Sequence, residues 1–369
     1  MSAKVVQVYG NEAGDLDSIV SSLAAAHLLR AMGTPAVAVC TFPRAEFRLR
    51  NDAVVAFKRA GWALDAAMAP VGVRFVDDDD DDDGMTAAPT AVALTDHNAL
   101  RQNNGARVVA IFDHHEDQGE HLDASPRVVD TRAGSACSLV VNAMHERSVA
   151  VPAELRSLLE VTIIVDTRNG KLGGDVDLRA LDVLGSAPAS RAAIFDEVWR
   201  ARHDVSSFSV TDLLRLDYKE LDVNGVRAGF AAVFEPMAAF VARGNVPAEC
   251  MDFLRAKRLT LLVAITAEAK ASHGERGLYV CCQPGDADVL AALTRGLQQC
   301  PQGLSPELLA SPLCQAQQIH THGFGVRPDL TAVSPPSPSS AAYYLRAPIT
   351  RKTLLPAAAE VLARFVRRL

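Results

Sequence analysis

The chain has 369 residues, of which 49% are hydrophobic and 22% charged, and its formal net charge is −7. These values are those of a globular protein of about two domains, and they exclude disordered, collagen-like and strongly basic nucleic-acid-coating chains. No apolar run reaches the roughly 20 residues of a membrane helix, and the scattered cysteines, without a Cys-x-x-Cys pair, indicate a reducing compartment.

The first half of the chain alternates short apolar runs with helical patterns. We expect a helix at 18–31 and strands at 5–9, 36–41, 91–95, 108–112, 128–130 and 161–165. Short Val/Ile-rich runs between helices are typical of buried parallel strands. Residues 1–188 are therefore expected to form an α/β domain with a mainly parallel sheet flanked by helices. In such sheets ligands bind at the carboxyl ends of the strands.

The second half, residues 189–369, predicts an α+β domain. We expect the segment 185–192, which is rich in Ala, Ser and Gly, to be the linker between the domains. Strands are expected at 226–234, 258–266, 277–282 and 342–346, and helices at 286–299 and 356–369. The aspartate run at 77–83 and the Pro/Ser-rich segment 333–340 are expected to be solvated loops.

Acidic, amide and imidazole side chains directly follow four of the expected strands. They are Asn11, Asp15, Asp17, Asp96, Asp113, His114, His115 and Asp166. A single Asp-His pair is compatible with a surface turn, and Asp17 alone with a helix N-cap, but four such strand ends in one domain favour a site. Oxygen and imidazole ligands without a thiolate suit Mg²⁺, Mn²⁺ or Co²⁺ better than zinc. The set has enough ligands for two ions, which together activate a water for phosphoryl hydrolysis.

These four motifs, in this order and spacing, resemble those of the DHH phosphoesterase superfamily, whose name-giving tripeptide stands here at 113–115. The segments 216–220 and 350–356 resemble the second domain of family II pyrophosphatases, eukaryotic exopolyphosphatases and prune-type proteins. The resemblance covers nearly the whole chain. It implies a DHH metal-binding domain, a second domain that clamps phosphate, and an active site in the cleft between them.

The resemblance also implies a role for individual residues. One metal ion would be held by Asp17, Asp96, His114 and Asp166, and the other by Asn11, Asp15 and the bridging Asp96. Phosphate contacts would come from His115, Lys219, Arg351 and Lys352, and Asp113 could orient an imidazole. Further candidates for substrate contacts are Ser135, His273 and Arg276, for which a helix cap and a plain surface turn are the alternatives.

Two positions distinguish between pyrophosphatases, exopolyphosphatases and prune-type proteins. Asn11 stands where family II pyrophosphatases have His, and an amide oxygen is a harder ligand than imidazole, so we expect Mg²⁺ rather than Mn²⁺ or Co²⁺. His115 stands where prune-type proteins usually have Arg. We therefore expect an exopolyphosphatase that removes the terminal phosphate of linear polyphosphate. The alternatives are a pyrophosphatase or short-chain nucleotide phosphohydrolase, a nuclease for short oligonucleotides, and a prune-like cyclic-nucleotide phosphodiesterase and adaptor.

The resemblance sets expectations for partners and location as well. The expected partner is inorganic polyphosphate, with no nucleic acid and no membrane, and the expected state is a monomer. The N-terminal residues enter a strand pattern at once, so we expect no secretory signal. The cytoplasm, or an acidic organelle that stores polyphosphate, is the expected location.

Overall fold

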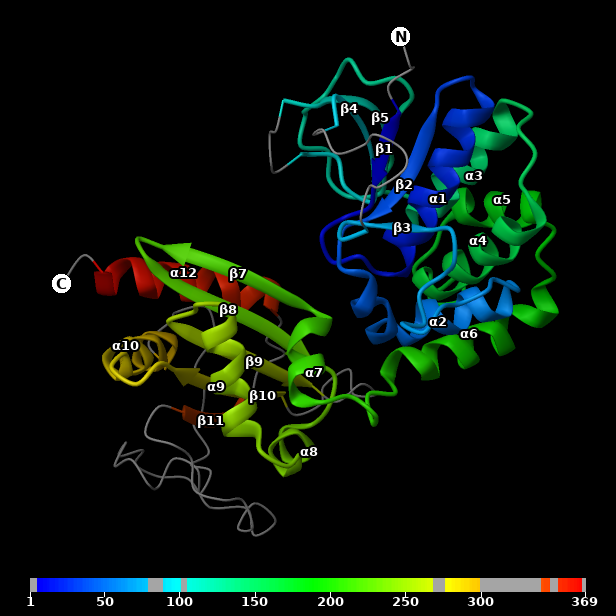
Figure 1. The fold of residues 1–369 in the computed structure, drawn as a ribbon. Helices are drawn as coiled ribbons and strands as arrows, with labels where there is room; N and C mark the ends of the chain where they lie inside the picture. The colour runs from blue at the N-terminus through cyan, green and yellow to red at the C-terminus, as the bar shows by residue number, and fades with distance from the viewer. Residues whose placement is uncertain are drawn as a thin grey trace. The chain divides into compact units, whose positions relative to one another are not determined.

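The computed structural model describes residues 5–78, 89–100, 105–267, 276–298, 340–345 and 351–366 (Figure 1). The chain divides into two compact units, Met1–Asp204 and Val205–Leu369. Residues 333–339 of the predicted loop 333–340, residues 79–83 of the aspartate run and His273 lie outside the described residues, while Ser340 begins a strand. Asp78, at the start of that run, is not merely solvated, because its carboxylate pairs with Arg44 at 2.6 Å.

A six-stranded parallel sheet forms the centre of the first unit. In spatial order its strands are β3 (Arg74–Phe75), β2 (Ala36–Cys40), β1 (Val6–Tyr9), β4 (Ala91–Thr95), β5 (Arg107–Asp113) and β6 (Arg127–Val129). The chain builds outwards from β1 in one direction and then returns to add β4 on its other side. This change of direction makes the carboxyl ends of β1 and β4 the topological switch point of the sheet, where open α/β sheets bind ligands.

Helices cover one face of this sheet. Helix α1 (Leu16–Ala31) packs on β1, β2 and β4, and α3 (Ala136–Glu146) packs on α1 and β5. Figure 1 shows α1, α3, α4 (Ala153–Asp166) and α5 (Asp175–Leu184) together on that side. A separate, smaller apolar cluster includes Val92 and Leu94 of β4 (Ala91–Thr95) and Val108 and Ile111 of β5 (Arg107–Asp113). Most of α1 is buried because it has the sheet on one side and helices on the other.

Two predicted features of the first unit were wrong. Residues 161–165 are not a strand but the last part of α4, whose Leu158, Leu159 and Ile163 are all fully buried. A short apolar run is compatible with both a buried strand and a buried helix. The segment 185–192 is not a free linker, because Pro188 begins helix α6 (Pro188–His203), which buries Ile194 and Val198 in the core of the first unit. The first unit therefore extends to Asp204.

The second unit contains a five-stranded mixed sheet. Its spatial order is β11 (Ser340–Leu345), β10 (Arg276–Cys282), β9 (Leu261–Ala267), β8 (Val226–Val233) and β7 (Tyr218–Val223). Only β8 and β9 are parallel among these pairs. The β7–β8 turn places Asn224 and Gly225 at φ +51° and +89°, as a tight hairpin requires. The expected combination of an α/β domain with a parallel sheet and an α+β second domain is confirmed.

Helices pack on this second sheet too. Helices α10 (Ala287–Gln298) and α12 (Arg351–Val366) form an apolar core with one face, while α8 (Met237–Ala242) and α9 (Val246–Ala256) pack on β9 and β10. Helix α7 (Val210–Leu216) leads into β7 and contacts β8. Helix α12 begins five residues before the expected 356, at Arg351. No helix in the described part of the chain is both long and apolar enough to cross a membrane.

Candidate metal centre

Three of the four predicted motifs meet at the carboxyl edge of the parallel sheet. Strands β1, β4 and β5 are neighbours, so the residues that follow them, Asn11, Asp96 and His114, come together. Asp17 lies in the first turn of α1, and Asp166 joins from the end of α4 rather than from a strand. Asp166 therefore lies near Asp17 and His114, but it ends a helix and not, as predicted, a strand.

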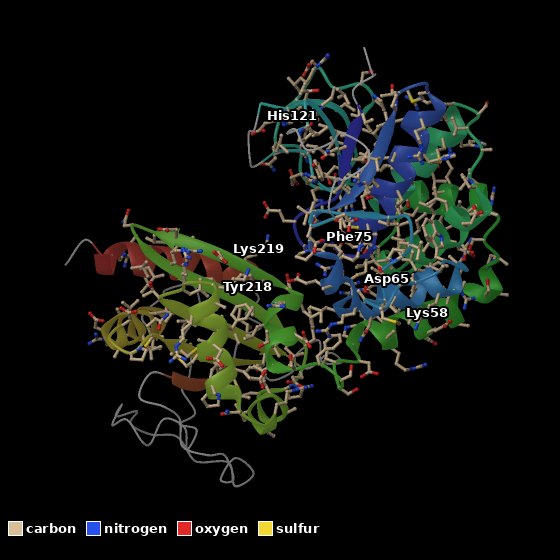
Figure 2. All side chains as sticks on the ribbon, viewed as in Figure 1. Lys58, Asp65, Phe75, His121, Tyr218 and Lys219 are labelled. Carbon is tan, nitrogen blue, oxygen red and sulfur yellow. The ribbon has the colours of Figure 1, made fainter. Side chains whose placement is uncertain are left out.

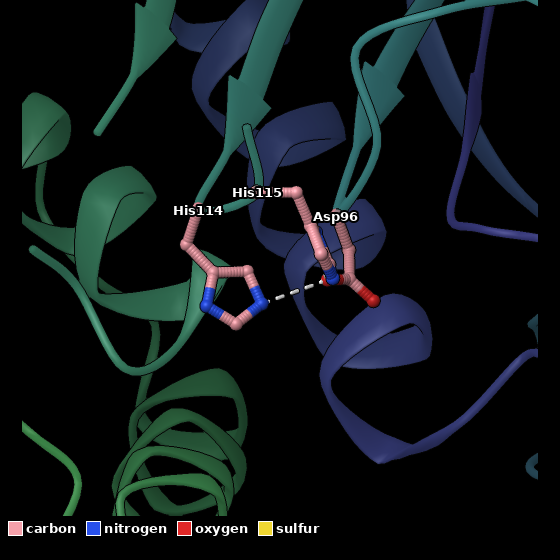
Figure 3. Close-up of side chains that lie close together, drawn as sticks. All are labelled: Asp96, His114 and His115. Atoms are coloured by element: carbon pink, nitrogen blue, oxygen red, sulfur yellow. Dashed lines mark hydrogen bonds and ion pairs between the residues drawn. The ribbon is translucent and has the colours of Figure 1, made fainter. Parts of the chain in front are cut away.

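Asp96 is the centre of the cluster, with only 3% of its surface exposed. Its Oδ2 accepts hydrogen bonds from Asn11 Nδ2 and Ser18 Oγ, both at 2.6 Å. Its Oδ1 lies 3.1 Å from His114 Nε2 and 3.6 Å from His115 Nδ1 (Figure 3). The backbone of Asp96 has a φ of +61°, a left-handed conformation that is uncommon outside glycine and often marks a functional site.

His114 is oriented by a contact behind its ring. Its Nδ1 lies 3.3 Å from the carbonyl oxygen of Ala133, so Nε2 faces the carboxylates of Asp96, at 3.1 Å, and Asp17, at 3.8 Å. This is the arrangement in which a second hydrogen bond fixes a metal-ligating imidazole. Burial lowers the pKa of His114, but the hydrogen bond to Asp96 and the surrounding carboxylates outweigh it and raise the pKa to about 10.

The carboxylates of this cluster repel one another, and this repulsion contributes to the raised pKa values of Asp96 and Asp166. Burial, with a contribution from the charge of Asp15, raises the pKa of Asp96 to about 7. Burial and the charge of Asp17 raise the pKa of Asp166 well above its ordinary value. Such a cluster strongly attracts positive charge.

Two overlapping groups of side chains could each hold a metal ion. Within each group the ligand atoms lie within 4.8 Å of one another: Asp17, His114 and Asp166 in one, and Asp96, His114 and His115 in the other. Carboxylate oxygens and imidazole nitrogens without thiolates are donors for divalent ions such as Mg²⁺ and Mn²⁺. The residues present therefore fit a centre for divalent metal ions.

Asp17 is held by the N-terminus of α3. Its carboxylate, 2% exposed, accepts hydrogen bonds from Ser135 Oγ at 2.7 Å and from the backbone N–H groups of Ala136 at 2.7 Å and Cys137 at 3.1 Å. The prediction that Ser135 contacts substrate was therefore wrong, because Ser135 is fully buried and supports Asp17. Cys137 is fully buried, and burial raises the pKa of its thiol well above the ordinary value, which disfavours the reactive thiolate.

Asn11 does not present its oxygen as expected. Its Oδ1 accepts hydrogen bonds from the backbone N–H groups of Ala13 at 2.8 Å and Gly14 at 3.3 Å, while its Nδ2 donates to Asp96. The amide oxygen is used by the turn that follows β1, so Asn11 orients Asp96 in this arrangement. Nearby, Asp15 is the N-cap of α1 and accepts from the backbone N–H of Ser18 at 3.0 Å.

His115 and Asp113 form a second pair at the end of β5. Asp113 is completely buried, and its carboxylate accepts hydrogen bonds from His115 Nδ1 at 2.8 Å and from Asn98 Nδ2. Burial raises the pKa of Asp113, but these two hydrogen bonds outweigh it and lower the pKa overall. The hydrogen bond to Asp113 raises the pKa of His115, whose side chain is 54% exposed. His115 is therefore held in place and remains accessible to a bound molecule.

Sequence reasoning missed several supporting residues. Ser18 directly follows Asp17, and Asn98 lies two residues after Asp96; this closeness to predicted site residues was the signal that could have identified them. Arg202 had no such signal. It lies in the last turn of α6, 3.4 Å from the buried Asp52, and its charge lowers the pKa of Asp15, although burial raises it overall.

Apart from His115, the residues predicted to contact phosphate lie in the second unit. Lys219 is on β7 (Figure 2), where it pairs with Phe230 of β8. Arg351 and Lys352 begin α12, which packs on the β7–β8 hairpin. Arg276 is the first residue of β10.

Comparisons with known proteins agree with this architecture. Residues 5–164 match the profile of the DHH family N-terminal domain, and residues 196–360 match that of the DHHA2 domain. Exopolyphosphatase PRUNE1 of Homo sapiens is 30% identical over 275 residues, which are 70% of this chain and 59% of the relative. A Schizosaccharomyces pombe protein provisionally named exopolyphosphatase is 29% identical over 248 residues, which are 61% of this chain and 62% of the relative. The chain thus spans about three fifths of the length of these relatives.

Other similarities extend to pyrophosphatases. The manganese-dependent inorganic pyrophosphatase of Methanothrix thermoacetophila is 24% identical over 273 residues, which are 71% of this chain and 81% of the relative. Among solved structures, a Methanococcus jannaschii protein provisionally described as a family II inorganic pyrophosphatase superposes with a TM-score of 0.54. It shares 13% sequence identity, and the match covers 97% of this chain and 99% of that protein. This structural likeness shows a shared fold.

Proposed function

Because the chain belongs to the DHH family, with a DHHA2 domain after its DHH domain, we propose that it is a metal-dependent exopolyphosphatase. The reaction would be hydrolysis of the terminal phosphate of linear inorganic polyphosphate. The observation that carries the proposal is the convergence of Asp17, His114 and Asp166 in one ligand group and of Asp96, His114 and His115 in another. The imidazole of His114 belongs to both groups.

The metal ions would be held by residues of the first unit. Asp17, His114 and Asp166 would hold one ion and Asn11 and Asp15 the other, with Asp96 between them. For the second set, the amide of Asn11 has to turn its oxygen away from the Ala13–Gly14 backbone. When bound, two divalent ions supply an activated water and neutralise phosphate oxygens. We propose Mg²⁺ as the ion, while the name of the Methanothrix relative identifies manganese for that protein.

The chain's own residues would bind and orient the phosphates. His115 has its Nδ1 fixed by Asp113, and its raised pKa favours the imidazolium form, which binds a phosphate oxygen with a charge-assisted hydrogen bond. Lys219, Arg351 and Lys352 would neutralise the oxygens of the terminal and following phosphates. An active site between the two units, a monomeric state and a cytoplasmic or acidic-organelle location stay predictions.

The test is phosphate release with Mg²⁺ from long-chain polyphosphate and, separately, from pyrophosphate. We expect rapid release from polyphosphate and little from pyrophosphate. Asp166→Asn should abolish release, whereas Asp182→Asn, an exposed carboxylate of the same unit, should retain it. Release from pyrophosphate alone would identify a divergent pyrophosphatase. Release from neither substrate with Mg²⁺, Mn²⁺ or Co²⁺ would overturn the proposal in favour of a phosphodiesterase or an adaptor.

A further inference from the structure

The turn between β1 and α1 is held by an arginine from a different part of the chain. Arg50 lies directly before α2 (Asn51–Arg59), and its guanidinium donates to the carbonyl oxygens of Gly14, of Ala13 at 2.9 Å and of Glu46 at 3.1 Å. All three of these hydrogen bonds go to backbone oxygens. Arg50 therefore connects the segment before α2, which includes the 3₁₀ helix η1 (Arg44–Leu49), to the turn from which Asn11 and Asp15 project.

The turn is also fixed by packing. The guanidinium of Arg50 lies over the ring of Phe42, with its central carbon 3.4 Å from the ring centroid. Gly14 has a φ of +57°, and a Cβ placed there would lie 2.3 Å from the same ring. Thr41 Oγ1 donates to the carbonyl oxygen of Asn11 at 3.0 Å. Thr41, Phe42 and Arg50 thus hold the turn from one side.

The two ligand sets have separate supports. Asp15 directly follows Gly14, whose carbonyl oxygen Arg50 holds, so a shift of the turn would displace the Asp15 carboxylate. Asp17 is held instead by Ser135 and by the start of α3, and His114 by Ala133. None of these contacts links the set of Asp17, His114 and Asp166 to Arg50.

We propose that Arg50 is a positioning residue for one of the two metal ions, the ion that Asn11 and Asp15 would hold. This inference rests on the two-ion centre of the proposed function. The planar fork of an arginine can donate to two neighbouring carbonyls while its face lies on an aromatic ring, which the single ammonium of a lysine cannot do. Lysine at position 50 would keep the charge and lose the fixed turn.

The experiment is titration of the metal-free full chain with Mn²⁺, by calorimetry and by electron paramagnetic resonance. We expect the wild type to bind two ions and to show the spectrum of a coupled pair. Arg50→Met and Arg50→Lys should each retain one ion with unchanged affinity, weaken the other at least 10-fold, and show an isolated Mn²⁺ spectrum. The control is Arg48→Met, an exposed arginine of the same segment, which should still bind two ions.

Each contrary result has a distinct meaning. Arg50 variants that bind both ions normally, or that lose both ions equally, would overturn the positioning role. Circular dichroism of the metal-free proteins shows whether they are folded. If Arg50→Met does not fold, the titration is done with Arg50→Lys alone. If neither variant folds, Arg50 belongs to the fold and the inference fails. A wild type that binds fewer than two ions would overturn the two-ion centre itself.

Discussion

The carboxylate of Asp17 lies on the N-terminus of α3, where it accepts a 2.7 Å hydrogen bond from the backbone N–H of Ala136. A negative charge is favourable at this end of a helix, because the helix dipole and the unpaired N–H groups point towards it. The helix start is thus occupied by a side chain of the protein itself. This contact fixes one metal-facing carboxylate independently of the others.

Ser135→Ala should weaken both the fold and the metal centre. The hydroxyl of Ser135 caps α3 and donates to Asp17, so its loss should cost about 0.5–2 kcal/mol of unfolding free energy. Loss of a residue that orients a metal ligand typically weakens metal binding by about 10- to 100-fold. Chemical unfolding and Mn²⁺ titration measure the two effects. Ser190→Ala, on α6, should change neither, and unchanged metal affinity in Ser135→Ala would contradict the role given to Ser135.

Asp166→Asn should stabilise the metal-free protein while it destroys the metal centre. The raised pKa of Asp166 means that its ionised form is unfavourable in the folded state. A neutral amide removes that repulsion, and a gain of about 1 kcal/mol would raise the melting temperature by roughly 2–4 °C. Thermal unfolding in EDTA and with Mg²⁺ checks this. A lower melting temperature in EDTA would show that the carboxylate instead stabilises the fold.

The metal-free protein should lose stability as the pH rises. Asp96 has its pKa raised from 3.8 to about 7, and His114 from 6.5 to about 10. A group whose pKa is higher in the folded state contributes its full stabilisation at a pH below its pKa in the unfolded state. That stabilisation is lost as the pH rises through its pKa in the folded state. We therefore expect a decline between about pH 4 and 7 from Asp96, and between about pH 6.5 and 10 from His114.

Thermal unfolding in EDTA across this range measures the decline. His114→Asn should flatten the part above pH 7, while His121→Asn should leave it unchanged. Metal affinity should move in the opposite direction and increase with pH, because ions compete with protons for the same ligands. A melting temperature that increases from pH 7 to 9 in EDTA would refute the assignment.

Asn98→Ala should impair catalysis without loss of metal. Asn98 donates to Asp113, which in turn holds His115, so its removal frees the imidazole from its fixed position. We expect kcat/KM for polyphosphate to fall by about 10- to 100-fold, as for other residues that orient a functional side chain. Mn²⁺ stoichiometry should remain that of the wild type. An equal loss of metal would show that Asn98 supports the metal ligands as well.

Much of the fold and the site could be predicted from the sequence. The parallel strands around β1, β4 and β5 have short apolar runs, and their polar ends converge because parallel strands share one carboxyl edge. The position of Asp166 at a helix end could not be predicted, since a five-residue apolar run does not distinguish a buried strand from a buried helix.

Contacts between distant segments could not be predicted either. The sequence does not show that Ser135 faces Asp17 or that Arg50 holds Gly14, because these pairings depend on how α1, α2 and α3 pack. The orientation of the Asn11 amide depends on backbone N–H groups only two and three residues away, yet it needs the geometry of the turn.

The order of the strands has a consequence for synthesis on the ribosome. Strand β1 leaves the ribosome first, but its neighbour β4 begins at Ala91. Asn11 and Asp96 are separated by 85 residues, and Asp17 and Ala136 by 119. The nascent chain must therefore keep the central strand paired on one side only while nearly half of the first unit is translated, and such long-range pairing folds slowly. A metal ion that Asp166 helps to hold would therefore bind only after Asp166 has been translated.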